Sequence, residues 1–362
     1  MSHYSRTAAL LGEVCLTKFG RLRAAQQTEV SRRAWRARLD ALPFGLTELP
    51  LFAIVVLLAS WQVTLRSYDP NGVALMGMTN VVNGTGGDLS QYRVLSPFVA
   101  LGVQLLLGDA VPPFQMLRFA QMLIISVLTY LYYGQLGLRP ITRLLGICLL
   151  AGLISLSMGI SGPSSFSLDR FDDTIFYLVA GLLVLRGQEG WIPPLMVLAV
   201  ANRETSVFMP TLILARYGWQ SRRALVTAGI AWAVGALVYL GIHTYYGPRP
   251  RVEESYWGTA MVMRSMRMPG QVAFFLAAIN LLPAMVVLTL RDVDPFLRRL
   301  FWYVVPLWFA VHIWAARLGE GIMYLAPTTL IIVPLVLQGL ERRLVRTPGE
   351  TALEAGLQRP AS

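Results

Sequence analysis

Long apolar stretches, most of them close to the length of a bilayer-crossing helix, alternate with short arginine-bearing segments along this chain of 362 residues. A helix needs about 20 apolar residues to cross the hydrocarbon core of a membrane. Only 14% of the residues are charged, whereas a soluble domain carries roughly a quarter. The sequence therefore predicts an all-α integral membrane protein, a multi-span helical bundle of about eight to ten transmembrane helices.

The regular apolar runs cover residues 49–66, 114–134, 141–160, 174–186, 224–244, 271–290, 300–316 and 322–340. Two further runs are irregular. Residues 94–108 form a shorter run, which predicts a helix in the membrane interface after the first outer loop, or a short span. Residues 191–215 are interrupted by Arg203 and Glu204, and an ionised residue inside a membrane costs about 3 kcal/mol. We therefore expect a re-entrant or broken helix pair with these charges at its tip.

Basic residues lie between the apolar runs, and all 31 except Lys18 are arginine. The net charge of +11 is not a nucleic-acid signal, because the basic residues form no single patch, and we expect no nucleic-acid partner. The positive-inside rule places most arginines on the cytoplasmic side, with a basic arm at 1–47, a transmembrane domain at 48–341 and a tail at 342–362. The predicted topology is multi-pass, with both termini cytoplasmic.

Sharp catalytic motifs are absent from the sequence. It contains no P-loop, no Gly-x-Ser-x-Gly and no zinc signature, which argues against ATP-driven or hydrolytic chemistry. Cys15 and Cys148 fall in the basic arm and in an apolar run, so we expect no disulfide. The sequence assigns no cofactor and leaves a divalent cation open, because the adjacent carboxylates Asp172 and Asp173 are few ligands for a metal.

A glycine-rich loop on the outer face, Asn83 to Arg93, is the first candidate for chemistry. Its glycines let the backbone approach a ligand closely. Asp88 could act as a general base or a metal ligand, and Arg93 could hold a phosphate through two parallel hydrogen bonds. The alternative is a solvated loop with a turn and an arginine that extends to the membrane surface, which the loop by itself favours.

The second candidate is the triplet Asn202, Arg203 and Glu204 inside the interrupted run. Ionisable residues within a membrane segment are candidates for function. Adjacent residues on a helix point about 100° apart, so Arg203 and Glu204 pair poorly with each other. We therefore expect each of them to reach a different partner.

A third charged run reads Asp-Arg-Phe-Asp-Asp over residues 169–173 and precedes an apolar run. We expect Asp172 or Asp173 to cap the helix that follows, where a carboxylate is favoured by the helix dipole. A cap accounts for one of the three aspartates. Arg317 and Glu320 form a further charged pair in the turn before the last run.

Together these features resemble the GT-C superfamily of bacterial membrane glycosyltransferases, most of all members thought to help build cell-surface glycopolymers. The resemblance covers residues 48–340. It rests on Asp88-Leu89-Ser90-Gln91-Tyr92-Arg93, on the run at 94–108, on Asn202-Arg203-Glu204-Thr205 and on Arg317-x-x-Glu320.

The resemblance implies an enzyme that moves a sugar from a polyprenyl-phosphate donor to a cell-envelope glycan or lipid acceptor on the extracytoplasmic face. It makes Asp88 the candidate catalytic base and Asp69 its competitor. The candidate residues for the substrate and its phosphate are Tyr92, Arg93, Arg170, Asp172, Asp173, Asn202, Arg203, Glu204, Arg317 and Glu320. The implied partners are membrane lipids, the lipid-linked sugar and the acceptor, and the implied localisation is the bacterial inner (plasma) membrane.

Two other functions stay open. A transporter or flippase of a lipid-linked saccharide should carry polar residues through the full membrane depth, and often an internal repeat. This sequence has no clear repeat and its candidate site charges gather on one side, which favours the enzyme. A glycan polymerase without a GT-C fold would usually have larger, arginine-rich outer loops.

Overall fold

The structure, a computed structural model, describes residues 48–66, 73–85, 92–108, 113–161, 168–247, 281–315 and 321–345, with residues 262, 263, 267, 270 and 273. Contacts divide the chain into two units, residues 1–53 and residues 54–362. Residues 48–53 are the described part of the first unit, and the candidate site and the cavities belong to the second. Every described regular element is a helix, which confirms the all-α fold class.

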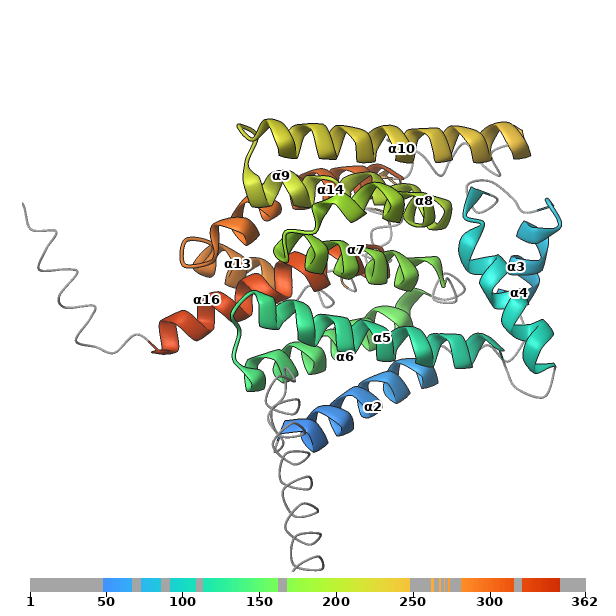
Figure 1. The fold of residues 1–362 in the computed structure, drawn as a ribbon. Coiled ribbons are helices and arrows are strands. Elements are labelled where there is room, and N and C mark those ends of the chain that lie inside the picture. The colour runs from blue at the N-terminus through green and yellow to red at the C-terminus, as the bar shows by residue number, and fades with distance from the viewer. Residues whose placement is uncertain are drawn as a thin grey trace, which may run out of the picture. The chain divides into compact units, whose positions relative to one another are not determined.

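The helices follow one another, most of them with short turns between them (Figure 1). The α-helices are α2 (Glu48–Arg66), α3 (Val73–Val82), α4 (Leu95–Leu107), α5 (Pro113–Gln135), α6 (Pro140–Ser161), α7 (Asp169–Leu185), α8 (Ile192–Asn202), α9 (Thr211–Tyr217), α10 (Arg222–Tyr246), α13 (Leu282–Thr289), α14 (Pro295–Ala315), α15 (Leu325–Pro327) and α16 (Val333–Val345). The shorter elements are the 3-10 turns η3 (Glu189–Trp191), η4 (Glu204–Phe208) and η6 (Gly321–Tyr324) and the π-helical segment η7 (Thr328–Ile332).

Six helical segments are long and apolar enough to cross a membrane, at 48–65, 114–135, 140–157, 222–246, 295–314 and 325–344. The chain is therefore a membrane protein with transmembrane helices. Helix α4 has only 13 residues and rises about 20 Å, which agrees with the expected short or interfacial helix. Most of the predicted run at 271–290 lies outside the described residues.

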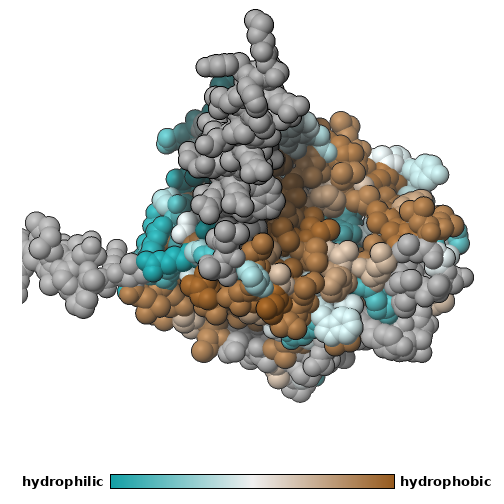
Figure 2. Space-filling model, turned by 60° about the horizontal axis from the view of Figure 1, so that its bottom comes forward, coloured by the Kyte–Doolittle hydropathy of each residue, from teal (hydrophilic) through white to brown (hydrophobic). Residues whose placement is uncertain are grey.

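Apolar side chains cover much of the described surface. Figure 2 shows broad hydrophobic areas on one face, with hydrophilic side chains gathered toward one side of it. On α10, Leu225 and Leu237 are exposed while Ala228 and Gly235 are buried. A Cβ atom on Gly235 would lie 2.8 Å from the Met196 methyl group, so the small residues let α10 pack closely on α8.

The run at 191–215 folds as a helical hairpin with a break at its tip, as predicted. Helix α8 ends at Asn202, Arg203 is extended with φ −160° and ψ 139°, and η4 and α9 lead the chain back. The two ends of the hairpin meet, because Tyr217 Oη donates a hydrogen bond of 3.0 Å to the carboxylate of Glu189. The hairpin packs against α7 and α10, and this packing holds its tip in place (Figure 1).

No helix is predicted between the apolar runs at 49–66 and 94–108, but the structure has one there. Residues 73–82 form α3, which packs against α4. Met78 and Val81, three residues apart on one face of α3, are buried. This local apolar pattern outweighs the glycines and polar residues around it, because a buried helical face stabilises even a short helix.

Charged residues of the bundle gather at two ends. The first, which we call the site end, holds the starts of α4 and α7 and the tip of the hairpin (Figure 1). The second, the arginine-rich end, holds the α5–α6, α7–α8, α9–α10 and α13–α14 turns and the last turns of α16. Its ion pairs join Arg139 to Glu341 at 3.2 Å, Arg223 to Glu189 at 3.0 Å and Arg343 to Asp292 at 2.7 Å. These arginine-bearing turns therefore share one end of the bundle.

Candidate functional site

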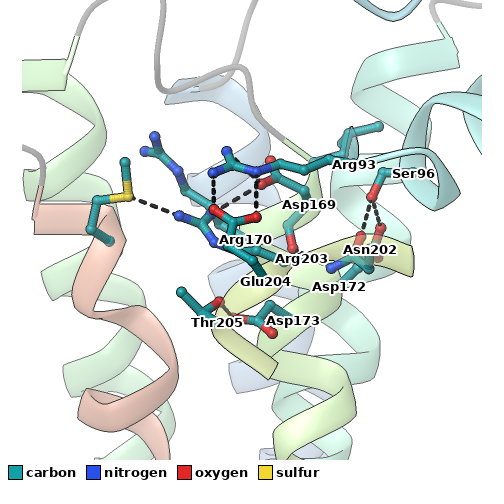
Figure 3. A network of polar contacts seen from close by, with 12 residues as sticks. Arg93, Ser96, Asp169, Arg170, Asp172, Asp173, Asn202, Arg203, Glu204 and Thr205 are labelled. Carbon is teal, nitrogen blue, oxygen red and sulfur yellow. Dashed lines mark hydrogen bonds and ion pairs between the residues drawn. The ribbon is translucent and has the colours of Figure 1, made fainter. Parts of the chain in front are cut away.

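Polar side chains from five separate segments meet at the site end in one network, the arginine–carboxylate cluster (Figure 3). Its members are Arg93 and Ser96 near the start of α4, Arg118 and Gln121 of α5, residues 169–173 in the first turn of α7, residues 202–206 of the hairpin, and Met323 of η6. Opposite charges accompany one another throughout the cluster, and their attraction offsets part of the cost of burying ionised groups.

Arg93 and Glu204 form a two-pronged ion pair. Arg93 Nε donates to Glu204 Oε2 at 3.1 Å and Arg93 Nη2 donates to Oε1, the geometry in which a guanidinium fixes a carboxylate. Burial would raise the pKa of Glu204, but the attraction and hydrogen bonds of Arg93 lower it to about 2. Since 35% of the Glu204 side chain is exposed, water screens part of that attraction. The pair is ionised at neutral pH.

Arg203 and Arg93 share one carboxylate oxygen. Arg203 Nη1 donates to Asp169 Oδ2 at 3.0 Å, and Arg93 Nη1 donates to the same atom at 3.3 Å. Arg203 Nη2 lies 3.1 Å from Met323 Sδ. The prediction that Arg203 and Glu204 reach different partners is confirmed, because the extended backbone at Arg203 directs the two side chains apart.

The prediction that Asp172 or Asp173 caps α7 is wrong. The residue before the helix is Leu168, and it makes no side-chain cap. Asp172 instead accepts hydrogen bonds of 2.6 Å from Ser96 Oγ and from Gln121 Nε2. Both aspartates follow the first helical residue, so their carboxylates face neighbouring helices rather than the free N–H groups of the first turn.

Asp173 is held by the hairpin. It accepts hydrogen bonds from Thr205 Oγ1 at 2.8 Å and from Ser206 Oγ at 3.0 Å, and its side chain is buried. Burial raises the pKa of Asp173 to about 7, although Arg203 and the two hydroxyl groups oppose that rise. The aspartate therefore changes its protonation state close to neutral pH.

Asn202 joins the hairpin tip to two other elements. Its Nδ2 donates to the Asp169 carbonyl at 2.7 Å, and its Oδ1 lies 2.6 Å from Ser96 Oγ, whose single hydrogen serves either Asn202 or Asp172. The side chain is fully buried, so an apolar replacement would leave polar partners unsatisfied. Asn202 thus fixes the positions of Arg203 and Glu204 relative to α7 and α4.

Several members of the cluster, namely Ser96, Arg118, Gln121 and Ser206, were not among the sequence candidates, whereas Asp169 and Thr205 stood in the quoted runs 169–173 and 202–205 without an assigned role. Arg118 is fully buried, lies 3.5 Å over the ring of Phe171 and donates to Gln121. A single arginine within the apolar run 114–134 is the one sequence signal that pointed to it. The hydroxyl and amide residues carry no such signal.

Tyr92 and Arg170 belong to the surroundings of this network. Tyr92 Oη donates to the Gly247 carbonyl at 3.0 Å, and its ring stacks on His243 with centroids 3.7 Å apart. Tyr92, His243 and Glu204 line one small cavity, so the stack borders the Arg93–Glu204 pair. Arg170 is buried in the first turn of α7.

Four of the predicted site residues, Asp69, Asp88, Arg317 and Glu320, lie outside the described residues. Within the described part of the chain, no group of three or more His, Cys, Asp or Glu residues is placed to hold a metal ion. Asp172 and Asp173 engage separate partners from α4, α5 and the hairpin. The idea of a divalent cation between these two carboxylates therefore gains no support from their geometry.

An apolar cavity of about 370 Å³ lies between α6, α13, α14 and residues 324–332. Its lining includes Leu153, Val286, Phe309 and Tyr324. Tyr324 directly follows Met323, the residue that contacts the Arg203 guanidinium. The residue that contacts Arg203 and a residue of the apolar cavity lining are thus adjacent in the chain.

This arrangement can bind an anion through guanidinium groups, accept or donate a proton through Asp173, and accommodate an apolar chain in the adjoining cavity. No protein-family model matches the sequence, and neither a curated protein nor a solved structure matches it.

Proposed function

We propose that the protein is a membrane glycosyltransferase that moves a sugar from a polyprenyl-phosphate donor to a glycan or lipid acceptor of the cell envelope. The observation that carries the proposal is the position of Arg203, whose guanidinium contacts Met323, the residue directly before Tyr324 of the apolar cavity lining. A lipid phosphate has the matching chemistry, a charged head directly joined to a long apolar chain. The likeness to GT-C enzymes at Arg93 and at 202–205 supports the same conclusion.

Arg93 and Arg203 are the proposed phosphate ligands. A guanidinium has five N–H donors, and the contacts within the described residues use three on Arg93 and two on Arg203. Both arginines share Asp169 Oδ2, so a phosphate could replace that shared contact or add to it. In the reaction, the sugar–phosphate bond breaks and the arginines stabilise the charge on the departing lipid phosphate.

The acceptor hydroxyl needs a base, and Glu204 is poorly suited to that role because its pKa lies near 2 and Arg93 holds both its oxygens. Asp88 and Asp69 are the proposed bases, as the GT-C likeness suggests. Asp88 stands five residues before Arg93 in the chain. We assign Glu204 and Asp169 the role of holding the arginines in position.

We further propose that the site end faces the extracytoplasmic side of the bacterial inner membrane. The positive-inside rule supports this orientation, because the opposite end carries the exposed arginines, including Arg139 and Arg223. A lipid-linked sugar in the outer leaflet could then reach the cluster laterally. Both termini would be cytoplasmic.

The alternative, a transporter of a lipid-linked saccharide, needs polar groups through the depth of the membrane. In the described part of the six candidate spans, charged residues fall in the first or last turns, as Arg143 and Arg342 illustrate, with Arg118 in the second turn of α5. No charged residue lies near the middle of those described helices. This distribution favours transfer at one surface over passage across the bilayer.

The test uses the full-length protein in liposomes with a panel of polyprenyl-phosphate sugars and candidate acceptors, scored for the transferred sugar. We expect wild type to transfer and Arg203→Gln to lose about 100-fold in rate, the usual effect of losing one transition-state donor. Glu189→Gln is the matched control, a buried carboxylate at the arginine-rich end, and should keep the rate. Asp88→Asn tests the base.

Transfer that survives both Arg203→Gln and Asp88→Asn would refute the site assignment. Movement of the donor across the bilayer with no transfer to any acceptor would refute the enzyme and identify a transporter. A reporter fused at residues 80–85 checks the orientation, and a cytoplasmic signal there would reverse it.

A further inference from the structure

A polar cavity of about 510 Å³ lies at the arginine-rich end, away from the arginine–carboxylate cluster. It is formed where the α5–α6 turn, the α13–α14 turn and the last turns of α16 come together. The charged residues that line it are Arg139, Arg291, Asp292, Glu341 and Arg342. We call it the end pocket.

The carboxylates of the end pocket are already engaged. Glu341 pairs with Arg139, whose Nε lies 3.2 Å from Glu341 Oε1 and whose backbone N–H also donates to that carboxylate. Asp292 pairs with Arg343, which stands outside the pocket lining, at 2.7 Å. Each negative charge at the pocket thus has its own arginine.

Two lining arginines remain without a carboxylate. Arg342 Nη1 donates to the Asp292 backbone carbonyl at 2.7 Å, a neutral acceptor. Arg291 makes no hydrogen bond or ion pair with any residue that the structure describes, and its side chain is exposed. The pocket therefore carries about two uncompensated positive charges on groups shaped to bind phosphate oxygens.

The surroundings of the end pocket are apolar. Leu138 and Val293, which line it, are buried. Each wall also presents an exposed apolar side chain within a few residues of the pocket: Ile141 on α6, Leu288 on α13 and Leu344 on α16. A phosphate bound here would have exposed apolar surface beside it, which suits a phosphate that carries acyl chains.

We propose that the end pocket binds the phosphate group of an anionic phospholipid from the leaflet that borders the arginine-rich end. Basic pockets between the ends of transmembrane helices hold anionic headgroups through charge-assisted hydrogen bonds. Bound lipid would join the α5–α6 turn to the α13–α14 turn and α16. This site is independent of the sugar-transfer proposal.

Native mass spectrometry of the full-length protein in detergent tests the proposal, with phosphatidylglycerol, phosphatidylcholine or sodium phosphate added in separate titrations. We expect phosphatidylglycerol to bind more tightly than phosphatidylcholine. Arg291→Gln and Arg342→Gln should each weaken phosphatidylglycerol binding about tenfold, the loss expected for one charge-assisted hydrogen bond. Arg298→Gln, an exposed arginine of α14 outside the pocket, is the matched control and should bind as wild type does.

Two further arms separate the alternatives. Glu341→Gln removes a competing negative charge and should tighten phosphatidylglycerol binding, a gain that misfolding could not produce. Equal affinities for wild type, Arg291→Gln and Arg342→Gln would overturn the site. Sodium phosphate that binds as tightly as the lipid, with the same dependence on Arg291, would overturn the lipid assignment and identify a free-phosphate site.

Discussion

The two ends of this helical bundle use the same residue types in opposite ways. At the site end, Arg203 is 4% exposed and shares Asp169 with a second arginine. At the arginine-rich end, Arg223 pairs with Glu189 at the same 3.0 Å but leaves 82% of its side chain exposed. An exposed pair gains little, since water and salt screen it, whereas a buried pair depends on both partners.

The difference distinguishes exposed arginines, each of which contributes little to stability, from buried arginines that need several polar partners. Exposed arginines at one end of the bundle match the positive-inside pattern, and most of them could be exchanged singly at low cost. Buried arginines at the other end bring a desolvation cost, which several carboxylates, hydroxyls and amides offset together. Such an arrangement is hard to explain by topology alone and is typical of a site.

The largest expected effect comes from removing a buried guanidinium. Arg203→Met leaves Asp169 paired with Arg93 alone, and we expect a loss of about 3 kcal/mol in the free energy of unfolding. Arg223→Met, the exposed counterpart, should lose less than about 1 kcal/mol. Unfolding in mixed micelles with a rising fraction of SDS measures both. Equal losses would remove the distinction between the ends.

Each end of the bundle also contains a buried side-chain amide, and the two amides can be compared directly. Asn202 at the site end and Gln338 at the arginine-rich end each bridge separate elements, since Gln338 accepts from the Asp294 N–H and donates to the Leu136 carbonyl. Asn202→Ala and Gln338→Ala should each cost about 2 kcal/mol of stability, because buried partners lose their bonds. Only Asn202→Ala should also abolish sugar transfer in the liposome assay. Transfer lost equally in both would show that activity merely follows stability.

Protonation of Asp173 should give the site end a distinctive pH dependence. Its pKa rises from 3.8 in the unfolded chain to about 7 in the fold, so the folded protein binds more protons, and stability falls as pH rises toward and through 7. From about pH 6 to about pH 8 the free energy of unfolding should fall by about 1 kcal/mol.

Asp173→Asn should remove that slope, and Glu189→Gln at the arginine-rich end should retain it. The same unfolding assay at a series of pH values measures both variants. A slope that persists in Asp173→Asn would assign it to another group.

The smallest effect is expected for a surface pair. Arg139, with 60% of its side chain exposed, pairs with Glu341. Arg139→Gln should change the free energy of unfolding by less than about 0.5 kcal/mol, and less still at high salt. A loss above about 2 kcal/mol in the same assay would mean that this end also depends on its individual charges.

The membrane-spanning helices of this protein and the break at the hairpin tip can be predicted from local sequence. Apolar runs of sufficient length predict the spans, and the charges at Arg203 and Glu204 predict the hairpin tip, because ionised groups cannot remain within a lipid-facing helix. The separation of these two neighbours onto different partners was predicted from helical geometry, but in the structure it comes from the extended backbone at Arg203. Helix α3 was missed, since its short apolar face is flanked by glycines and polar residues.

Pairings across the site were decided by tertiary structure alone. Nothing local distinguishes Ser96 or Thr205 from other hydroxyl residues, and each acquires its role only when packing buries it beside Asp172 or Asp173. The same holds for Asp172 and Asp173, which were expected at a helix cap. Their buried carboxylates need hydrogen-bond donors, and neighbouring helices and the hairpin supply those donors. Sequence thus determined a membrane bundle with charges at a hairpin tip, and packing decided which arginine meets which carboxylate.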